Sequence, residues 1–69
     1  MQYRFRISLN DGVYVAECLD FPECRVENTN LFELKKEIKK KMADNLNKTV
    51  FDSDIFPVYT RDVILSTVH

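Results

Sequence analysis

Apolar and polar residues alternate strictly near the start of the chain. The apolar members of this alternation are Tyr3, Phe5, Ile7 and Leu9. Such a period of two predicts a half-buried strand over Tyr3–Leu9. Asp11-Gly12 follows, a pair typical of a two-residue type I′ turn. The alternation then resumes and predicts a returning strand at Val13–Leu19.

The turn determines the register of this hairpin. If Asp11 and Gly12 form the loop, the pairs on the core face are Leu9 with Tyr14, Ile7 with Ala16, and Phe5 with Cys18. Arg6 then opposes Glu17 on the other face, where opposite charges contribute a few tenths of a kcal/mol to about 1 kcal/mol. A slip of one residue would move Glu17 to the core side, so the pattern specifies one register.

Asp20-Phe21-Pro22-Glu23 interrupts the alternation, because proline cannot donate to a sheet ladder. We interpret these four residues as a loop. Alternation returns briefly at Cys24–Glu27 and predicts a third strand, antiparallel to the second. The side chains that would then line the face away from any helix are Arg4, Arg6, Ser8, Val13, Val15, Glu17, Arg25 and Glu27. One helix cannot cover both faces, so this face is either solvated or an interface. We expect a homo-oligomer, because association adds buried area to so thin a domain.

A helical pattern follows the third strand. Asn30 with Glu33 three residues later resembles a capping box, which predicts a helix starting at residue 31. Apolar residues then recur with a period near 3.6, at Leu31, Leu34, Ile38 and Met42. The asparagines Asn45 and Asn47 indicate that the helix ends near residue 47.

The last segment is rich in β-branched residues. Asp52-Ser53-Asp54 indicates a loop, and Val58–Val68 predicts a final strand, with a possible bend at residues 59–62. The predicted fold class is therefore α+β with the order β-β-β-α-β. A three-stranded antiparallel meander carries one helix on one face, and a right-handed crossover makes the fourth strand parallel to the first. Phe5, Ile7, Ala16, Leu34 and Ile38 should be buried together.

Composition narrows the possible functions. The chain has 69 residues, of which 45% are hydrophobic and 30% charged, which is typical of one small folded domain. No apolar run is long enough to span a bilayer and no secretory segment opens the chain, so we expect a cytoplasmic protein. Ten basic and eleven acidic side chains give a net charge of −1, which makes nucleic acid an unlikely partner.

The charges are distributed unevenly. Residues 1–30 carry three basic and five acidic side chains, residues 31–48 carry six and three, and residues 49–69 carry one and three. Cys18 and Cys24 match no zinc-binding spacing, so we expect two reduced thiols and neither metal nor cofactor.

One stretch resembles a known family. Residues 14–24 read Tyr-Val-Ala-Glu-Cys-Leu-Asp-Phe-Pro-Glu-Cys, similar to the Y-x-A-x-x-x-x-L-P-G-C stretch of the HicB-type antitoxin fold. Further along, Asn28, Asn30, Glu33 and Leu34 stand where that family has Gly, Thr, Glu and Ala. Asn28 would tolerate the left-handed backbone of a turn, and Asn30 would keep the helix cap.

The resemblance covers residues 3–50 well and 58–68 loosely, and it implies a partial RNase H-like fold. In HicB proteins this domain covers the active site of HicA, a small mRNA interferase. Full-length HicB antitoxins usually add a C-terminal DNA-binding domain. We expect a single HicB-like domain over residues 1–69, without that addition. The implied function is a non-catalytic module that binds and masks a HicA-like toxin.

Two groups of side chains are candidates for contacts. The loop Asp20, Phe21, Pro22 and Glu23 places two carboxylates around an apolar corner and is the candidate for binding a basic toxin. Its alternative role is a plug that closes the end of the core. Lys35, Lys36, Lys39 and Lys40 form a possible basic surface on the helix. Their alternative is a solvated helix face whose apolar stems cover the core edge.

No catalytic or metal-binding set is predicted. Asp11, Glu17, Asp20 and Asp62 are the carboxylates that an RNase H-like metal site would need, but their spacing does not bring three of them together. A Cys–His pair would need His69 to be ordered near Cys18 or Cys24. Two alternative functions stay open: a homo-oligomeric HicB-like domain without a toxin partner, and a weak RNA-binding or degenerate nuclease domain.

Overall fold

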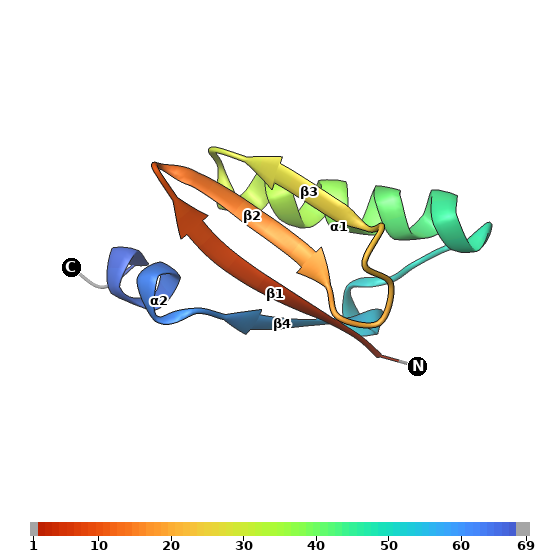
Figure 1. Cartoon of the computed structure of the whole chain (residues 1–69). Helices are drawn as coiled ribbons and strands as arrows, with labels where there is room; N and C mark the ends of the chain where they lie inside the picture. Colours follow the sequence, from red (N-terminus) through yellow and green to blue (C-terminus); the bar gives the residue numbers. More distant parts are fainter. Residues whose placement is uncertain (1, 68–69) are drawn as a thin grey trace.

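The computed structural model describes residues 2–67 and has an α+β fold with one mixed sheet (Figure 1). In chain order the elements are β1 (Tyr3–Asn10), β2 (Val13–Cys18), β3 (Arg25–Asn28), α1 (Leu31–Leu46), the 3₁₀ turn η1 (Asp52–Asp54), β4 (Ile55–Tyr59) and α2 (Arg61–Thr67). The strands lie in the order β3-β2-β1-β4. β1, β2 and β3 form the predicted antiparallel meander, and β4 runs parallel to β1. The predicted fold class is thus confirmed.

The β1–β2 hairpin has the predicted register. Phe5 pairs with Cys18 and Ile7 with Ala16, while Arg6 faces Glu17 on the opposite side of the sheet. The turn residues Asp11 and Gly12 have φ values of 52° and 79°. A type I′ turn requires positive φ at both central positions, which a short polar residue followed by glycine provides.

A single core lies between α1 and the sheet. Its buried members are Tyr3, Phe5, Ile7, Ala16, Cys18, Cys24, Leu34, Ile38, Met42, Val50 and Val63. The five core residues predicted from the sequence are all among them. Val15 is also buried, with 6% of its surface exposed, but it lies on the face away from α1, between Ser8 and Glu27. We call this face of the sheet the outer face.

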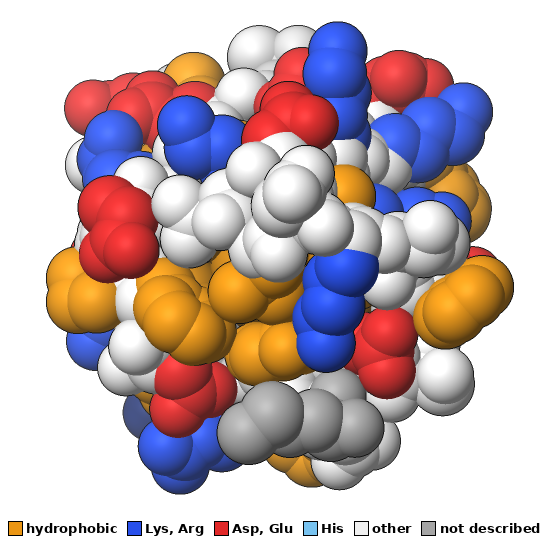
Figure 2. Space-filling view, turned by 90° about the vertical axis from the view of Figure 1, so that its right-hand side faces the viewer, with side chains coloured by type: hydrophobic (Ala, Val, Ile, Leu, Met, Phe, Trp, Pro, Cys, Tyr) orange, Lys and Arg blue, Asp and Glu red, His pale blue; other side chains and the backbone are white. Residues whose placement is uncertain are grey.

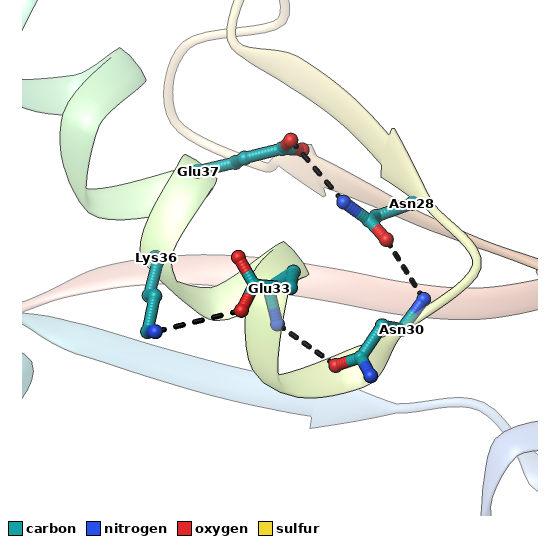
Figure 3. A network of polar contacts seen from close by, with 5 residues as sticks. All are labelled: Asn28, Asn30, Glu33, Lys36 and Glu37. Carbon is teal, nitrogen blue, oxygen red and sulfur yellow. Dashed lines mark hydrogen bonds and ion pairs between the residues drawn. The ribbon is translucent and has the colours of Figure 1, made fainter.

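Asparagine residues cap α1 at both ends. At the start, the side-chain oxygen of Asn30 accepts a hydrogen bond from the Glu33 backbone N–H, as a capping residue does (Figure 3). At the end, Asn47 takes the left-handed conformation and its N–H donates to the Ala43 carbonyl. The predicted capping box is only half formed: the Glu33 carboxylate pairs with Lys36, and the Asn30 N–H donates to the Asn28 side chain instead.

Asn28 has a different role from the one that the resemblance implied. Only Asp11 and Asn47 among the described non-glycine residues have positive φ, so Asn28 forms no left-handed turn. Its side-chain oxygen accepts a 2.8 Å hydrogen bond from the Asn30 N–H, and its amide nitrogen donates to Glu37 at 3.2 Å (Figure 3). These two hydrogen bonds of Asn28 therefore connect the end of β3 to the first turns of α1.

The predicted strand at Val58–Val68 is wrong for most of its length. The strand is Ile55–Tyr59, a second short helix spans Arg61–Thr67, and residue 68 lies outside the described residues. The Thr60 N–H donates to the Ile7 carbonyl at the end of the β4–β1 pairing. The Thr60 carbonyl then accepts a hydrogen bond from the Ile64 N–H, which forms the first turn of α2. β-branched residues favour strands, but burial of Val63 in the core overrides that preference here.

Two smaller boundaries also differ from the prediction. The third strand is Arg25–Asn28 rather than Cys24–Glu27, and the loop at residues 52–54 is a 3₁₀ turn. Pro57 lies inside β4, which is an edge strand. Since the Thr60 N–H points toward β1, alternation places the missing N–H of Pro57 on the open edge, where no ladder bond is lost.

Candidate functional site

The loop proposed to bind a partner lies at the end of the sheet where β1 and β4 begin (Figure 1). Asp20 accepts a 3.2 Å hydrogen bond from the Arg4 N–H, and its carboxylate also pairs with the Arg4 guanidinium at 3.5 Å. The half-buried Phe21 ring packs on the core beside Tyr3, with ring centroids 5.9 Å apart. Pro22 and Glu23 are exposed. Phe21 thus closes the core from within, while Pro22 and Glu23 face outward.

Two exposed apolar side chains flank Arg4 at this same end. Leu19 continues the β2 ladder, its N–H donating to the Arg4 carbonyl at 2.8 Å, and Phe56 pairs with Arg4 from the other side. Alternation therefore places Leu19, Arg4 and Phe56 in one row on the outer face. Val58 stands in the next row, beside Arg6. The exposed fractions are 45% for Leu19, 48% for Phe56 and 40% for Val58.

We call Leu19, Phe56 and Val58 the outer-face patch. The predicted last strand begins at Val58, three residues after the start of β4, so the pattern does not pair Phe56 with Val58. Leu19 belongs to the predicted returning strand, but it is exposed because it lies directly before the loop that follows. Figure 2, which looks at the end of the molecule where β1 and β4 begin, shows hydrophobic side chains across its middle with charged side chains around them.

Ion pairs make the outer face nearly neutral. Arg6 pairs with Glu17 at 3.7 Å, as predicted, and Arg25 pairs with Glu27. All of these side chains are substantially exposed, so each pair contributes little to stability. Their guanidinium and carboxylate groups are available to exchange partners at an interface.

The predicted basic surface is divided between two sides of α1. Lys35, Lys36 and Lys39 line a groove between α1 and β4, whereas Lys40 lines a shallower hollow beside Lys41 and Val26. The groove has a volume of about 410 Å³ and lies on the core side of the sheet. Its apolar lining consists of Ile7, Phe32, Ile38, Ile55 and Pro57.

The three lysines of the groove have different partners. Lys39 pairs with Asp52 at 2.8 Å, and this hydrogen bond, together with the lysine charge, holds the pKa of the Asp52 carboxyl below its ordinary value of 3.8. Lys36 contacts Glu33 at 3.4 Å across one helical turn. Lys35 lies over the Tyr59 ring, with its ammonium 5.8 Å from the ring centre. The rim of the groove is therefore cationic despite the two carboxylates.

The two cysteines are structural. Both thiols are free and buried, and the Cys18 N–H donates to the Cys24 carbonyl at 3.0 Å. Burial is the main cause that raises the pKa of the Cys24 thiol; the nearby Cys18 and Glu23 raise it further, against a smaller opposite effect of Lys41. A neutral thiol without access to solvent is a poor nucleophile.

The carboxylates considered for a metal site are separated. Asp11 lies in the hairpin turn, Glu17 faces Arg6, Asp20 contacts Arg4 and Asp62 lies in the first turn of α2. Within residues 2–67, no three Asp, Glu, His or Cys side chains come close enough to hold a metal ion. His69 lies outside the described residues. None of the helices in that range is long and apolar enough to cross a membrane.

The chain matches no protein-family model, and neither a curated protein nor a solved structure matches it. The resemblance to HicB-type antitoxins thus stays a prediction from the residues quoted above.

Proposed function

We propose that the chain is a non-catalytic protein-binding module of the HicB antitoxin type, which masks a small toxin ribonuclease by covering its active site. The observation that carries the proposal is the outer-face patch. Leu19, Phe56 and Val58 expose apolar surface around two arginines, on a sheet face that α1 does not cover. Aromatic residues and arginine are enriched at the centre of protein interfaces.

The charges beside the patch suit a basic partner. Asp20 and Glu23 lie in the loop that adjoins Leu19, and Asp20 already accepts hydrogen bonds from Arg4. A cationic side chain of the toxin would replace or share that contact. Charges at the rim of an interface mainly accelerate association, whereas apolar burial at the centre slows dissociation.

Steric masking is the mode of action that these side chains support. The carboxylates of the sheet are engaged with arginines or turns, and both thiols are buried. Such a surface can occupy a partner's active site without performing chemistry there.

The test is a binding titration against the product of the adjacent gene, which the proposal expects to be a small basic ribonuclease, with RNA cleavage as a second readout. The double variant Leu19→Ala/Phe56→Ala removes most of the outer-face patch and should weaken binding about thirtyfold or more, since hot-spot truncations cost at least about 2 kcal/mol. Leu65→Ala is the matched control, because Leu65 is 60% exposed on α2, at the opposite end of β1 (Figure 1). It should leave the dissociation constant unchanged within about twofold.

Two further variants separate the loop from the patch. Asp20→Lys should lower the association rate and weaken the dependence of that rate on salt. The dissociation rate should change less than the association rate. Phe21→Ala should lower thermal stability because its ring packs on the core. Equal affinity of all variants for the ribonuclease would contradict the proposal.

Sedimentation of the chain alone distinguishes the main alternative. A homo-oligomer that Leu19→Ala/Phe56→Ala dissociates, combined with no binding to the ribonuclease, would assign the outer-face patch to self-association instead. A monomer that binds and inhibits the ribonuclease supports the antitoxin function.

A further inference from the structure

The groove between α1 and β4 is independent of the proposed protein-binding surface, because it lies on the opposite side of the sheet. Ile55 and Pro57 pair with Tyr3 and Phe5, whose side chains lie on the core face. Phe56 and Val58 of the outer-face patch alternate with them and lie on the opposite face. α1 packs over β2 and β3, and α2 contacts β1 and β4 near the far end of the sheet. Part of β4 therefore stays uncovered beside α1.

Two chemically distinct parts make up the groove. Its floor is aliphatic: Ile7 and Ile38 are fully buried at the bottom, and Ile55 and Pro57 are half-buried along the strand side. A volume of about 410 Å³ is within the range of sites for small molecules.

The rim on the helix side follows from the helical period. Phe32, Lys35, Lys36 and Lys39 are spaced by three, four and seven residues, so they stand on one stripe of α1. From Phe32 to Lys39 the stripe is about 10 Å long at 1.5 Å per residue. Phe32 is 78% exposed, the most exposed large apolar side chain among residues 2–67. An aromatic ring at one end and ammonium groups along the edge favour an occupant that is apolar and anionic.

The lysines differ in their availability to such an anion. Lys39 is engaged by Asp52 at 2.8 Å, and that carboxylate would repel an anion at its end of the groove. Lys36 has an exposed, weak contact with Glu33, and Lys35 lies over the Tyr59 ring. Lys35 and Lys36 are therefore the pair that would receive a single negative charge through charge-assisted hydrogen bonds.

An added peptide strand is disfavoured as the occupant. The open edge of β4 lacks the N–H of Pro57, so a strand pairing there would lose a donor in the middle of the five-residue ladder. Recognition must come from the aliphatic floor and the lysine side chains. We infer that the groove binds a small amphipathic carboxylate, with an aliphatic body along Ile55 and Pro57 and its carboxylate between Lys35 and Lys36.

Octanoate, used below its micelle concentration, is the probe that tests this inference. Methyl resonances of Ile7 and Ile55 should shift in a saturable manner in NMR titrations, and the binding should persist at moderate salt. Octanol has the aliphatic chain without the charge, and acetate has the carboxylate without the long chain. Each should bind at least tenfold more weakly than octanoate.

A matched pair of charge reversals locates the carboxylate. Lys35→Glu/Lys36→Glu should weaken octanoate binding at least tenfold. Lys40→Glu/Lys41→Glu changes the net charge equally on the other side of α1 and should alter it less than twofold. All four lysines are exposed, so melting curves should show that both variants fold. Phe32→Ala, which leaves every lysine in place, should weaken binding about threefold.

Three results would overturn the inference: octanoate that shifts no groove resonance, octanol that binds as tightly as octanoate, or the two charge reversals weakening binding equally. None of these results depends on the toxin or on the outer-face patch. The groove and the proposed antitoxin function can therefore fail separately.

Discussion

The two halves of the sheet differ in how completely they are covered. Beneath α1, the side chains of Phe5, Ala16 and Ile38 have at most 1% of their surface exposed. Along β4, the inward-facing Ile55 and Tyr59 are only half-buried, and the outward-facing Phe56 is 48% exposed. We call these the covered half and the open half. α1 covers one face of β2 and β3, whereas part of β4 is exposed on both faces.

This difference shows where a small domain can hold function. The covered half contains most of the core, and its inward-facing side chains are buried. The open half contributes side chains to both candidate surfaces, Phe56 and Val58 to the outer-face patch and Ile55 and Pro57 to the groove. Because a chain of this size buries only about 60% of its surface, incomplete coverage provides binding surface without further elements.

The largest expected contrast is in stability. Ile38→Ala in the covered half leaves a cavity and should cost about 2 to 5 kcal/mol of unfolding free energy. Ile55→Ala in the open half removes a half-exposed side chain and should cost about 1 kcal/mol. Urea denaturation of both variants measures the difference. Equal losses would mean that the open half is packed as tightly as the covered half.

Thiol reactivity provides a second comparison. Cys24 is fully buried and its pKa is raised, so at pH 8 it should react with iodoacetamide about tenfold or more slowly than a cysteine introduced by Val58→Cys. Peptide mass spectrometry over time distinguishes the two sites. Comparable rates would indicate that the β2–β3 loop opens readily.

The start of α1 allows a third test of the covered half. Asn30→Ala removes the acceptor for the Glu33 N–H and should destabilise the fold by about 1 kcal/mol. Asn45→Ala, at an exposed position inside the same helix, is the control and should be neutral or slightly stabilising. Thermal unfolding of the two variants distinguishes a capping effect from a general change in helix propensity.

The smallest effect concerns Asp52 at the edge of the groove. The hydrogen bond from Lys39 lowers its pKa, so the stabilising contact is complete above the ordinary value of 3.8 and is lost as the pH falls through the lower folded-state value. Lys39→Met should return the Asp52 pKa toward 3.8 in an NMR titration. Lys40→Met should leave it where it is, and a shift with both variants would show a general charge effect.

The sequence predicted the parts of the fold in which a local signal coincides with the tertiary structure. The Asp11-Gly12 turn and the alternation around it determine the hairpin register, and Asn30 and Asn47 mark the ends of α1. Near the end of the chain, the residues from 58 onward have strand propensity, yet α2 forms there because Val63 reaches the core. That contact joins segments more than fifty residues apart and leaves no local signal in the sequence.

The candidate surfaces were predictable only in part. Helical spacing placed the lysines of α1 on neighbouring positions, but it could not show that three of them border a groove, since the other wall is β4. The outer-face patch also depends on β4. Its prediction requires knowing which side chains of β4 share a face with Arg4 and Arg6 of β1. For Phe21 the sequence misleads in the opposite direction. Its position beside Pro22 suggests an exposed side chain, but its ring contacts Tyr3.

The pairing of β4 with β1 also has a consequence for the order of folding. β1 and β2 meet across a two-residue turn, whereas β4 reaches β1 only after Tyr3 and Ile55 have closed a loop of about fifty residues, which costs more chain entropy. The hairpin and α1 should therefore assemble first, and β4 should dock last and detach first. Its amide protons should exchange with solvent sooner than those of β1 and β2, in a partial opening that leaves the rest of the sheet intact.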